Sequence, residues 1–283
     1  MRAESLRAVG SEGGVFVGTA GDLLLVFDGE HVRRALLVDP MTAATMLVFP
    51  DRDDSSNGTG FAVAVGDAVL VDDRLAVPAR ADLYRAPTFA LAASLIDPTP
   101  ETRWGWPAAD AGHMAVFDPA DGLVYVFDLA AGVLARTLAN PARPLRVLPG
   151  FVRVHPFVVH DGRLIAGTAG GFHVFDLERG TLAYTIDDPT PASGHFGRHV
   201  VGDGGVLWVA DLGDGVVYAY DLASGAPLRA VADPGGDDPD FGRWIAVCGG
   251  DLLIGGTGRL HVVALASDSK TLLFRPCADV PPS

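Results

Sequence analysis

Short apolar runs alternate with small and polar residues along the whole chain. LLLVF at residues 23–27 and VVYAY at 216–220 are examples, and each is followed by an aspartate. Residues 124–138 show a fuller unit: an apolar run, then Asp-Leu-Ala-Ala-Gly, then a second run. Short runs rich in β-branched and aromatic residues, bounded by Gly and Asp, are typical of strands. Sustained helical periodicity with capping residues is lacking, so the pattern predicts an all-β fold.

The strand pattern also repeats at long range. Phe196-Gly197-Arg198 returns as Phe241-Gly242-Arg243, at an offset of 45 residues. An Asp-Pro or Asn-Pro pair returns at similar intervals, beginning at residues 39, 97, 140, 188 and 233. Self-similarity at such a period indicates a repeat architecture in which each repeat is one supersecondary unit.

Six units of four strands predict a β-propeller, in which four-stranded blades surround a central channel. We expect one domain over residues 1–283, with a Pro-rich tail at 278–283. The blades are expected to end near residues 40, 98, 141, 189, 234 and 277. The first blade takes LRAV, GVFVG, DLLLVF and VRRALLV as its strands. The unit at 41–98 is the longest and least regular, and a seventh blade there is the alternative.

Four aspartates end apolar runs: Asp28, Asp128, Asp176 and Asp221. Asn140-Pro141, Asp188-Pro189 and Asp233-Pro234 follow the last three by twelve residues, and Asp39-Pro40 follows Asp28 by eleven. An aspartate in this place can bind the backbone of its own turn, and a glycine four residues on suits a positive φ. We interpret the four aspartates as turn caps, with catalysis as the alternative.

The chain is acidic, with 35 Asp and Glu against 21 Lys and Arg and a net charge of −14. A nucleic-acid partner requires a basic surface, so the charge argues against one. No apolar run reaches the length of a membrane helix, and the opening MRAESLRAVGSEGG lacks the apolar stretch of a signal peptide. We expect a soluble, cytoplasmic protein without membrane insertion. Cys248 and Cys277 are interpreted as buried hydrophobes, with a single bridge as the alternative.

Residues 185–234 resemble a bacterial FG-GAP repeat. In that family an Asp-Pro-rich loop leads to Phe-Gly, then to a strand, a Gly-Asp bend and a strand that ends in aromatic-Asp. The likeness covers residues 185–265 best, and Ala210-Asp211 stands where the family has Gly-Ala-Pro. The strand-Asp-turn-Gly pattern is shared with WD-like propellers. The resemblance implies a propeller that binds other proteins, as the integrin α head does, and blades that in some members carry calcium.

Two Asp-rich segments are candidate calcium loops. Asp51, Asp53, Ser55 and Asn57 alternate as oxygen donors before a glycine, although that glycine comes late and no Glu stands at position 12. A polar inter-blade loop is the alternative. Residues 235–242 concentrate Asp237, Asp238 and Asp240 without alternation, which makes calcium there less favoured.

Histidine pairs and aromatic residues permit two interpretations each. His195 and His199 are four residues apart, and in a strand they would share one face as zinc ligands do. The position equivalent to His199 in the next repeat is Trp244, which favours a packing role for this position instead. Phe196 and Phe241 recur with their repeat, so we expect them between blades. The alternative is an exposed recognition patch together with the tryptophans.

No nucleophile elbow and no phosphate-binding glycine loop occurs in the sequence. We therefore predict a non-enzymatic protein-interaction or scaffold module, and one subunit of a larger assembly is a role it can fill. One alternative is a propeller enzyme, a metal-assisted hydrolase or lyase with its site in the channel. Another is a calcium-stabilised adhesion or ligand-binding protein. The sequence names no small-molecule ligand, and calcium is the one cofactor that its Asp-rich loops suggest.

Overall fold

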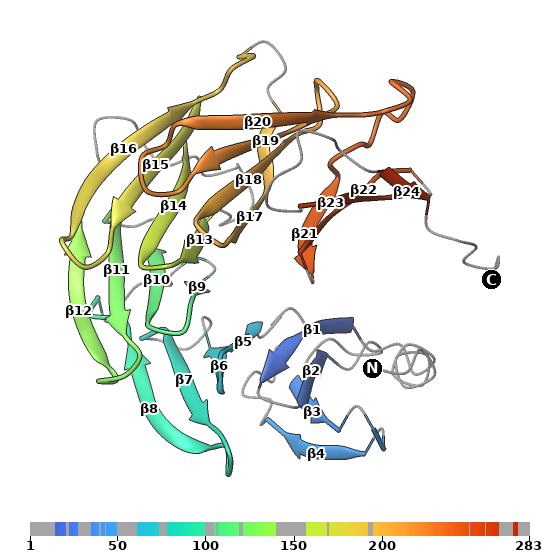
Figure 1. Cartoon of the computed structure of the whole chain (residues 1–283). Helices are drawn as coiled ribbons and strands as arrows, with labels where there is room; N and C mark the ends of the chain where they lie inside the picture. Colours follow the sequence, from blue (N-terminus) through green and yellow to red (C-terminus); the bar gives the residue numbers. More distant parts are fainter. Residues whose placement is uncertain are drawn as a thin grey trace. The chain divides into compact units, whose positions relative to one another are not determined.

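The computed structural model describes residues 15–20, 23–27, 35–39, 41, 42, 44–49, 61–73, 78–99, 105, 107–118, 121–139, 157–168, 170–191, 195–248, 250–257, 259–265 and 274–276. The chain divides into two compact units. Unit 1 is Met1–Asn140 with Pro149–Val152, and unit 2 is Pro141–Leu148 with Arg153–Ser283. The described strands form six four-stranded sheets (Figure 1), which we number blades 1 to 6 in chain order.

Unit 1 contains blades 1 to 3. Their strands are β1 (Val15–Ala20), β2 (Leu23–Phe27), β3 (Ala35–Val38) and β4 (Thr45–Val48); β5 (Phe61–Val65), β6 (Ala68–Asp73), β7 (Arg80–Arg85) and β8 (Ala90–Ile96); and β9 (Ala108–Ala109), β10 (His113–Asp118), β11 (Leu123–Asp128) and β12 (Val133–Leu138). Each strand pairs antiparallel with the next one along the chain. The blades are therefore simple meanders.

Unit 2 contains blades 4 to 6, with the same antiparallel order. Their strands are β13 (Phe157–His160), β14 (Arg163–Thr168), β15 (Gly171–Asp176) and β16 (Thr181–Asp187); β17 (Phe196–Asp203), β18 (Val206–Asp211), β19 (Val216–Asp221) and β20 (Pro227–Ala232); and β21 (Trp244–Cys248), β22 (Asp251–Gly255), β23 (Leu260–Ala264) and β24 (Phe274–Pro276). No helix occurs among the described residues. The predicted all-β fold of four-stranded blades is confirmed.

Blade 1 corrects the predicted blade boundary near residue 40. Its fourth strand is β4, so the blade extends to Val48. Asp39 begins the turn between β3 and β4, where its Oδ1 accepts a hydrogen bond from the N–H of Met41 at 2.7 Å. The Asp-Pro pair misled the assignment because an aspartate can cap the turn after a third strand as well as the loop after a fourth. The predicted strand LRAV lies outside the described residues.

The segment 41–98 holds β4 and then the whole of blade 2. The six described sheets therefore include no seventh blade in that segment. Blades 2 to 6 end at Ile96, Leu138, Asp187, Ala232 and Pro276.

The predicted turn caps are confirmed wherever they lie in described residues. Asp128, Asp176 and Asp221 each accept a hydrogen bond on Oδ1 from the N–H three residues further along, at 2.8 to 3.0 Å. The glycine one residue beyond has a φ between 69° and 74° in all three turns. In blade 2, Phe89 takes the place of that glycine with a φ of 49°. Asp28 lies outside the described residues.

Buried side chains fill the space between successive blades within each unit. One cluster joins blades 1 and 2, another joins 2 and 3, and two more join 4 with 5 and 5 with 6. The second strands are buried on both faces: in β18 every residue from Leu207 to Asp211 is buried. This double burial explains why the strands appear in the sequence as continuous apolar runs rather than as strict alternation.

The Phe-Gly repeat lies at these inter-blade contacts in unit 2. Phe241 is fully buried in the cluster of blades 5 and 6, and Phe196 contacts the ring of Phe172 in blade 4. Gly197 has a φ of 80°, and a Cβ there would lie 2.1 Å from a carbon of the Phe172 ring. Gly242 repeats the conformation with a φ of 86°. The motif returns because each copy needs an aromatic wedge and a glycine where adjacent blades meet.

Candidate functional site

In blade 3 a partly buried polar cluster connects the loop that follows blade 2 to the strands of blade 3. The Thr99 hydroxyl contacts Asp97 Oδ1 at 2.8 Å, Asp118 Oδ2 at 3.0 Å and the Tyr125 hydroxyl at 3.3 Å. The Thr99 N–H also donates to Asp97 Oδ1, at 2.9 Å. The Tyr125 hydroxyl donates to Asp121. Asp118 is fully buried, and the Thr99 hydroxyl supplies a partner that its carboxylate needs away from water.

Blade 5 repeats this cluster with equivalent residues. The Thr190 N–H donates to Asp188 Oδ1 at 2.8 Å, and its hydroxyl donates to Asp211 Oδ2 at 2.9 Å. Asp211 is fully buried and also accepts a hydrogen bond from the N–H of Gly213 at 3.0 Å. Tyr218 occupies the place of the blade 3 tyrosine. We call such a cluster a loop clasp, because it holds the loop that follows one blade against the second and third strands of the next.

Blade 6 builds its loop clasp from different residues. The loop begins at Asp233, whose Oδ2 accepts a hydrogen bond from the N–H of Asp238 at 2.9 Å. Asp238 Oδ1 in turn accepts one from the N–H of Thr257 at 3.1 Å. Gly256 stands where blade 5 has its buried aspartate, and a Cβ on Gly256 would lie 1.9 Å from Asp238 Oδ2. The loop therefore supplies the carboxylate that the strand end lacks, and the third strand carries His261 in place of tyrosine.

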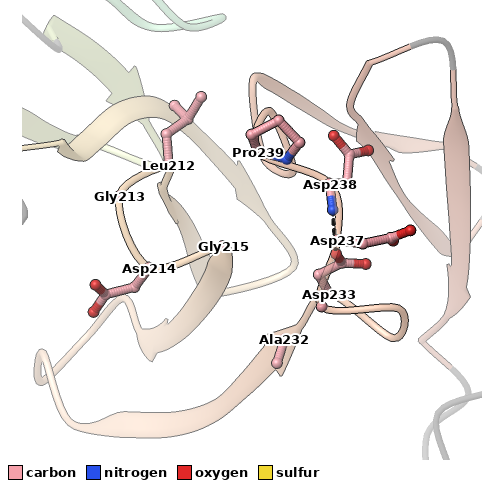
Figure 2. Close-up of a pocket in the computed structure, with 10 residues that line it drawn as sticks. Leu212, Gly213, Asp214, Gly215, Ala232, Asp233, Asp237, Asp238 and Pro239 are labelled. Atoms are coloured by element: carbon pink, nitrogen blue, oxygen red, sulfur yellow. Dashed lines mark hydrogen bonds between the residues drawn. The ribbon is translucent and has the colours of Figure 1, made fainter.

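A cleft of about 570 Å³ lies beside these clasps in unit 2. The turn Leu212–Gly215, between β18 and β19, forms one wall, and the loop from Asp233 to Pro239 forms the opposite wall (Figure 2). The lining residues are Leu212, Gly213, Asp214, Gly215, Ala232, Asp233, Gly236, Asp237, Asp238 and Pro239. They include four aspartates and no Lys, Arg or His. We call this feature the acidic cleft.

The Asp233 carboxyl of the acidic cleft has a lowered pKa. Burial acts to raise the pKa of the Asp233 carboxyl, but hydrogen bonds from the N–H groups of Asp238 and Gly235 outweigh it, and that pKa lies below its ordinary value. Asp237 pairs with Arg259 at 2.9 Å, and this hydrogen bond raises the pKa of the Arg259 guanidinium. Asp214 is exposed. The cleft therefore presents negative charge at neutral pH.

Of the two predicted calcium loops, only the second lies in described residues. Asp51, Asp53, Ser55 and Asn57 lie outside the described residues. Asp237, Asp238 and Asp240 come together in one loop, but their oxygens accept hydrogen bonds from the loop backbone, Thr257 and Arg259. Across the described part of the chain, no three His, Cys, Asp or Glu side chains are placed to hold a metal ion. That statement includes His195 and His199.

The aromatic residues divide between core and surface. Trp208 is buried on β18, with the Arg229 guanidinium 4.7 Å from its ring centre. Phe196 and Phe241 pack between blades, as the sequence predicts. Trp244 differs, because it is 41% exposed at the start of β21. Trp104, Trp106 and Cys277 lie outside the described residues, as does the side chain of Cys248.

Sequence reasoning missed the loop clasps, although a signal for them is present. The tetrapeptide Asp-Pro-Thr-Pro occurs at both 97–100 and 188–191. A second pattern, Asp-x-x-Asp-Gly-x-x-Tyr, occurs at both 118–125 and 211–218. Together these contain every residue of the clasps in blades 3 and 5. Comparing blades 3 and 5 directly, rather than neighbouring blades, would have identified them.

Comparisons with known proteins identify the fold. No protein-family model matches the chain, and no curated protein sequence matches it. Among solved structures, BamB from Moraxella catarrhalis is 17% identical, with a TM-score of 0.52 over 94% of this chain and 77% of that one. A chain of the Mitotic Checkpoint Complex is 10% identical, with a TM-score of 0.61 over 92% and 75%.

The computationally designed Ika8 protein is also similar, at 12% identity and a TM-score of 0.56 over 90% of this chain and 72% of that one. The fold is a β-propeller. At these identities the likeness is one of fold alone, and the specific FG-GAP assignment stays a prediction. Within the described residues, no helix has the length and apolar character to cross a membrane.

Proposed function

We propose that this β-propeller is a non-enzymatic interaction module whose acidic cleft holds a Lys- or Arg-rich segment of a partner protein. One observation carries the proposal: four of the ten residues that line the cleft are aspartates, and none is basic. Complementary charge steers association and selects partners. The net charge of −14 extends the same preference over the whole chain.

The carboxylates of the cleft already accept hydrogen bonds within the protein, which supports a binding role over a catalytic one. Asp233 and Asp238 accept hydrogen bonds from the backbone of their own loop, and Asp237 pairs with Arg259. Groups held in this way shape a surface, whereas a general acid or base must exchange its proton with substrate. One of the similar structures is a chain of the Mitotic Checkpoint Complex. This likeness supports the proposal that the present chain also works in a protein assembly.

A peptide-binding measurement tests the proposal directly. A fluorescent peptide of alternating Lys, Arg and Gly is titrated with the protein at about 50 and 300 mM salt, and a matched Glu and Gly peptide serves as the control probe. We expect the basic peptide alone to bind, with affinity falling at the higher salt. No saturable binding of the basic peptide at the lower salt would refute the proposal.

Matched variants locate the binding site. Asp214→Asn and Asp237→Asn each remove one charge from the cleft, and each is expected to weaken binding by about fivefold. Asp203→Asn removes a charge that is also exposed, at the end of β17 in the same unit and outside the lining residues. It is expected to change affinity by less than about twofold. Equal losses in all three variants would mean that net charge, and not the cleft, binds the peptide.

Affinity capture from the native cells, at low and moderate salt, then names the physiological partner. A stoichiometric protein with a basic segment is the expected result. Capture that survives in the Asp214→Asn and Asp237→Asn double variant as well as in the original chain would place the partner elsewhere on the propeller.

A further inference from the structure

In each of the three blades that have a loop clasp, the third strand contributes one polar side chain, and the three side chains occupy equivalent positions in the strand pairing. Tyr125 in blade 3 lies opposite Val116, Tyr218 in blade 5 lies opposite Val209, and His261 in blade 6 lies opposite Ile254. Burial raises the pKa of both tyrosines above its ordinary value, so they remain neutral hydroxyls across the physiological range. Histidine, in contrast, is the side chain whose charge changes between about pH 5 and 8.

Asp238 faces this histidine from the loop. The Asp238 side chain is 2% exposed, and its Oδ2 lies 3.8 Å from His261 Nε2. Asp238 Oδ1 has donors in the N–H groups of Thr257 and Asp240, both at 3.1 Å. Oδ2 is buried with no hydrogen-bond donor among the described residues. A buried carboxylate oxygen without a donor is unfavourable, and a protonated imidazole is the group nearby that can supply one.

Several other groups lie near His261. Electrostatic attraction to His261 contributes to the lowered pKa of the Asp233 carboxyl, which lies on the loop. Arg259, the cation nearest in the sequence, is engaged by Asp237 at 2.9 Å. The strands on either side place the uncharged Ile254 and Pro276 opposite His261. The Phe241 ring stands edge-on, with its centre 5.1 Å from that of the imidazole.

We infer that His261 and Asp238 form a pH-sensitive clasp that fastens the loop of the acidic cleft to blade 6 when the imidazole is protonated. Protonation lets Nε2–H donate to Asp238 Oδ2, and the charge-assisted hydrogen bond holds the Asp233–Pro239 wall in place. Loss of that proton removes the attraction, and the wall is then held by the N–H groups that donate to Asp233 and Asp238 and by the Asp237–Arg259 pair. The inference concerns the order of the loop and does not depend on what binds in the cleft.

Amide hydrogen exchange of the whole chain tests the clasp. The N–H groups of Thr257 and Asp240 report on blade 6 because both donate to Asp238 Oδ1. The N–H of Gly213 is an internal control, because it donates to Asp211 in the tyrosine-containing clasp of blade 5. Protection factors corrected for intrinsic exchange are compared at about pH 5.5 and 7.5. We expect Thr257 to be about fivefold more protected at the lower pH and Gly213 to be unchanged within about twofold.

Two variants assign the effect to the histidine. His261→Gln keeps a polar side chain without a proton to titrate, and it should abolish the pH dependence at Thr257. His261→Tyr introduces the residue found in blades 3 and 5 and should do the same. His195→Gln, at an exposed histidine of the same unit, should behave as the original chain. Equal Thr257 protection at both pH values, or an unchanged pH dependence in His261→Gln, would overturn the inference.

An NMR titration of the original chain keeps the inference testable if the His261 variants fail to fold. The ring-proton shift of His261 is followed against pH and compared with that in Asp238→Asn, which removes the negative partner. A midpoint lower in Asp238→Asn by about half a pH unit or more supports the clasp. The same midpoint in both proteins overturns it.

Discussion

Blades 5 and 6 solve the same problem with different residues. In blade 5 the buried carboxylate is Asp211, at the end of the second strand, and Thr190 reaches it from the loop. In blade 6 the strand end is Gly256, and Asp238 brings a carboxylate from the loop into the space that a strand side chain would occupy. The two blades therefore share a carboxylate at the same location in space, beside the end of the second strand, although it comes from different positions in the sequence.

The difference also affects how each blade responds to pH. Blade 5 completes its clasp with a tyrosine, whereas blade 6 completes its own with His261, which can gain a charge. The same two blades differ in the packing of their Phe-Gly motifs. These contrasts lead to four predictions, all at positions within unit 2.

The largest effect is expected at the two phenylalanines. Phe241 is fully buried between blades 5 and 6, so Phe241→Ala should lower the free energy of unfolding by about 3–5 kcal/mol. Phe196 is only partly buried, so Phe196→Ala should lower it by less. Chemical denaturation followed by tryptophan fluorescence measures both. The reverse ranking would contradict the packing described for the two motifs.

The glycines beside them should rank the other way. Both have positive φ, so alanine at either position adds about 1–2 kcal/mol of backbone strain. A Cβ at Gly197 would lie 2.1 Å from the Phe172 ring, whereas at Gly242 it would lie 3.2 Å from Ala210 Cβ. We expect Gly197→Ala to lower stability by about 2–4 kcal/mol and Gly242→Ala by about half of that. If both variants lost the same free energy of unfolding, backbone strain alone, and not the clash with the Phe172 ring, would account for the loss.

The buried carboxylates come next. Asp211→Asn should lower the free energy of unfolding by about 2–3 kcal/mol, because its amide nitrogen replaces one of the two oxygens that accept hydrogen bonds from Thr190 and Gly213, and that donor is left buried without an acceptor. In blade 6, Asp238→Gly and Gly256→Asp should each destabilise. Their combination rebuilds the arrangement of blade 5 and should recover at least about 1 kcal/mol of the summed loss. Strict additivity in this double-mutant cycle would mean that the two positions do not share one space.

The smallest effect at neutral pH is expected at Tyr220. Its counterpart in blade 6 is Val263, since each lies opposite the equivalent leucine of the second strand. Burial raises the pKa of Tyr220 to about 12, against about 10 in an unfolded chain. A raised pKa stabilises the folded state below pH 10, and this contribution is lost as the pH rises toward 12.

Tyr220→Phe tests this sign. The variant should differ from the original chain by less than about 1 kcal/mol at pH 7 and should lose less stability between about pH 10 and 12. Thermal unfolding at several pH values measures the difference. Tyr184 carries a similarly raised pKa of about 12 and is present in both proteins, so it does not affect the comparison. Parallel pH profiles would contradict the assignment of the alkaline loss to Tyr220.

Local rules in the sequence determined most of the fold. Continuous apolar runs predict strands buried on both faces, and an aspartate followed four residues later by a glycine predicts a capped hairpin turn. Both patterns act over a few neighbouring residues, so they can be read without knowing what lies across the interface. The same locality explains the error in blade 1, where Asp39 caps a turn one strand earlier than expected. An aspartate binds whichever turn follows it, and nothing local distinguishes the two.

The tertiary structure alone decided the site. Asp214 and Asp238 belong to different turns and become opposite walls of one cleft only because blades 5 and 6 follow each other in space. Asp238 replaces a strand carboxylate because Gly256 leaves room for it, 18 residues further along the chain. Propensity and periodicity describe a residue's immediate neighbours along the chain. They carry no information on which loop approaches which strand end, and in this protein that approach places the charges of the acidic cleft.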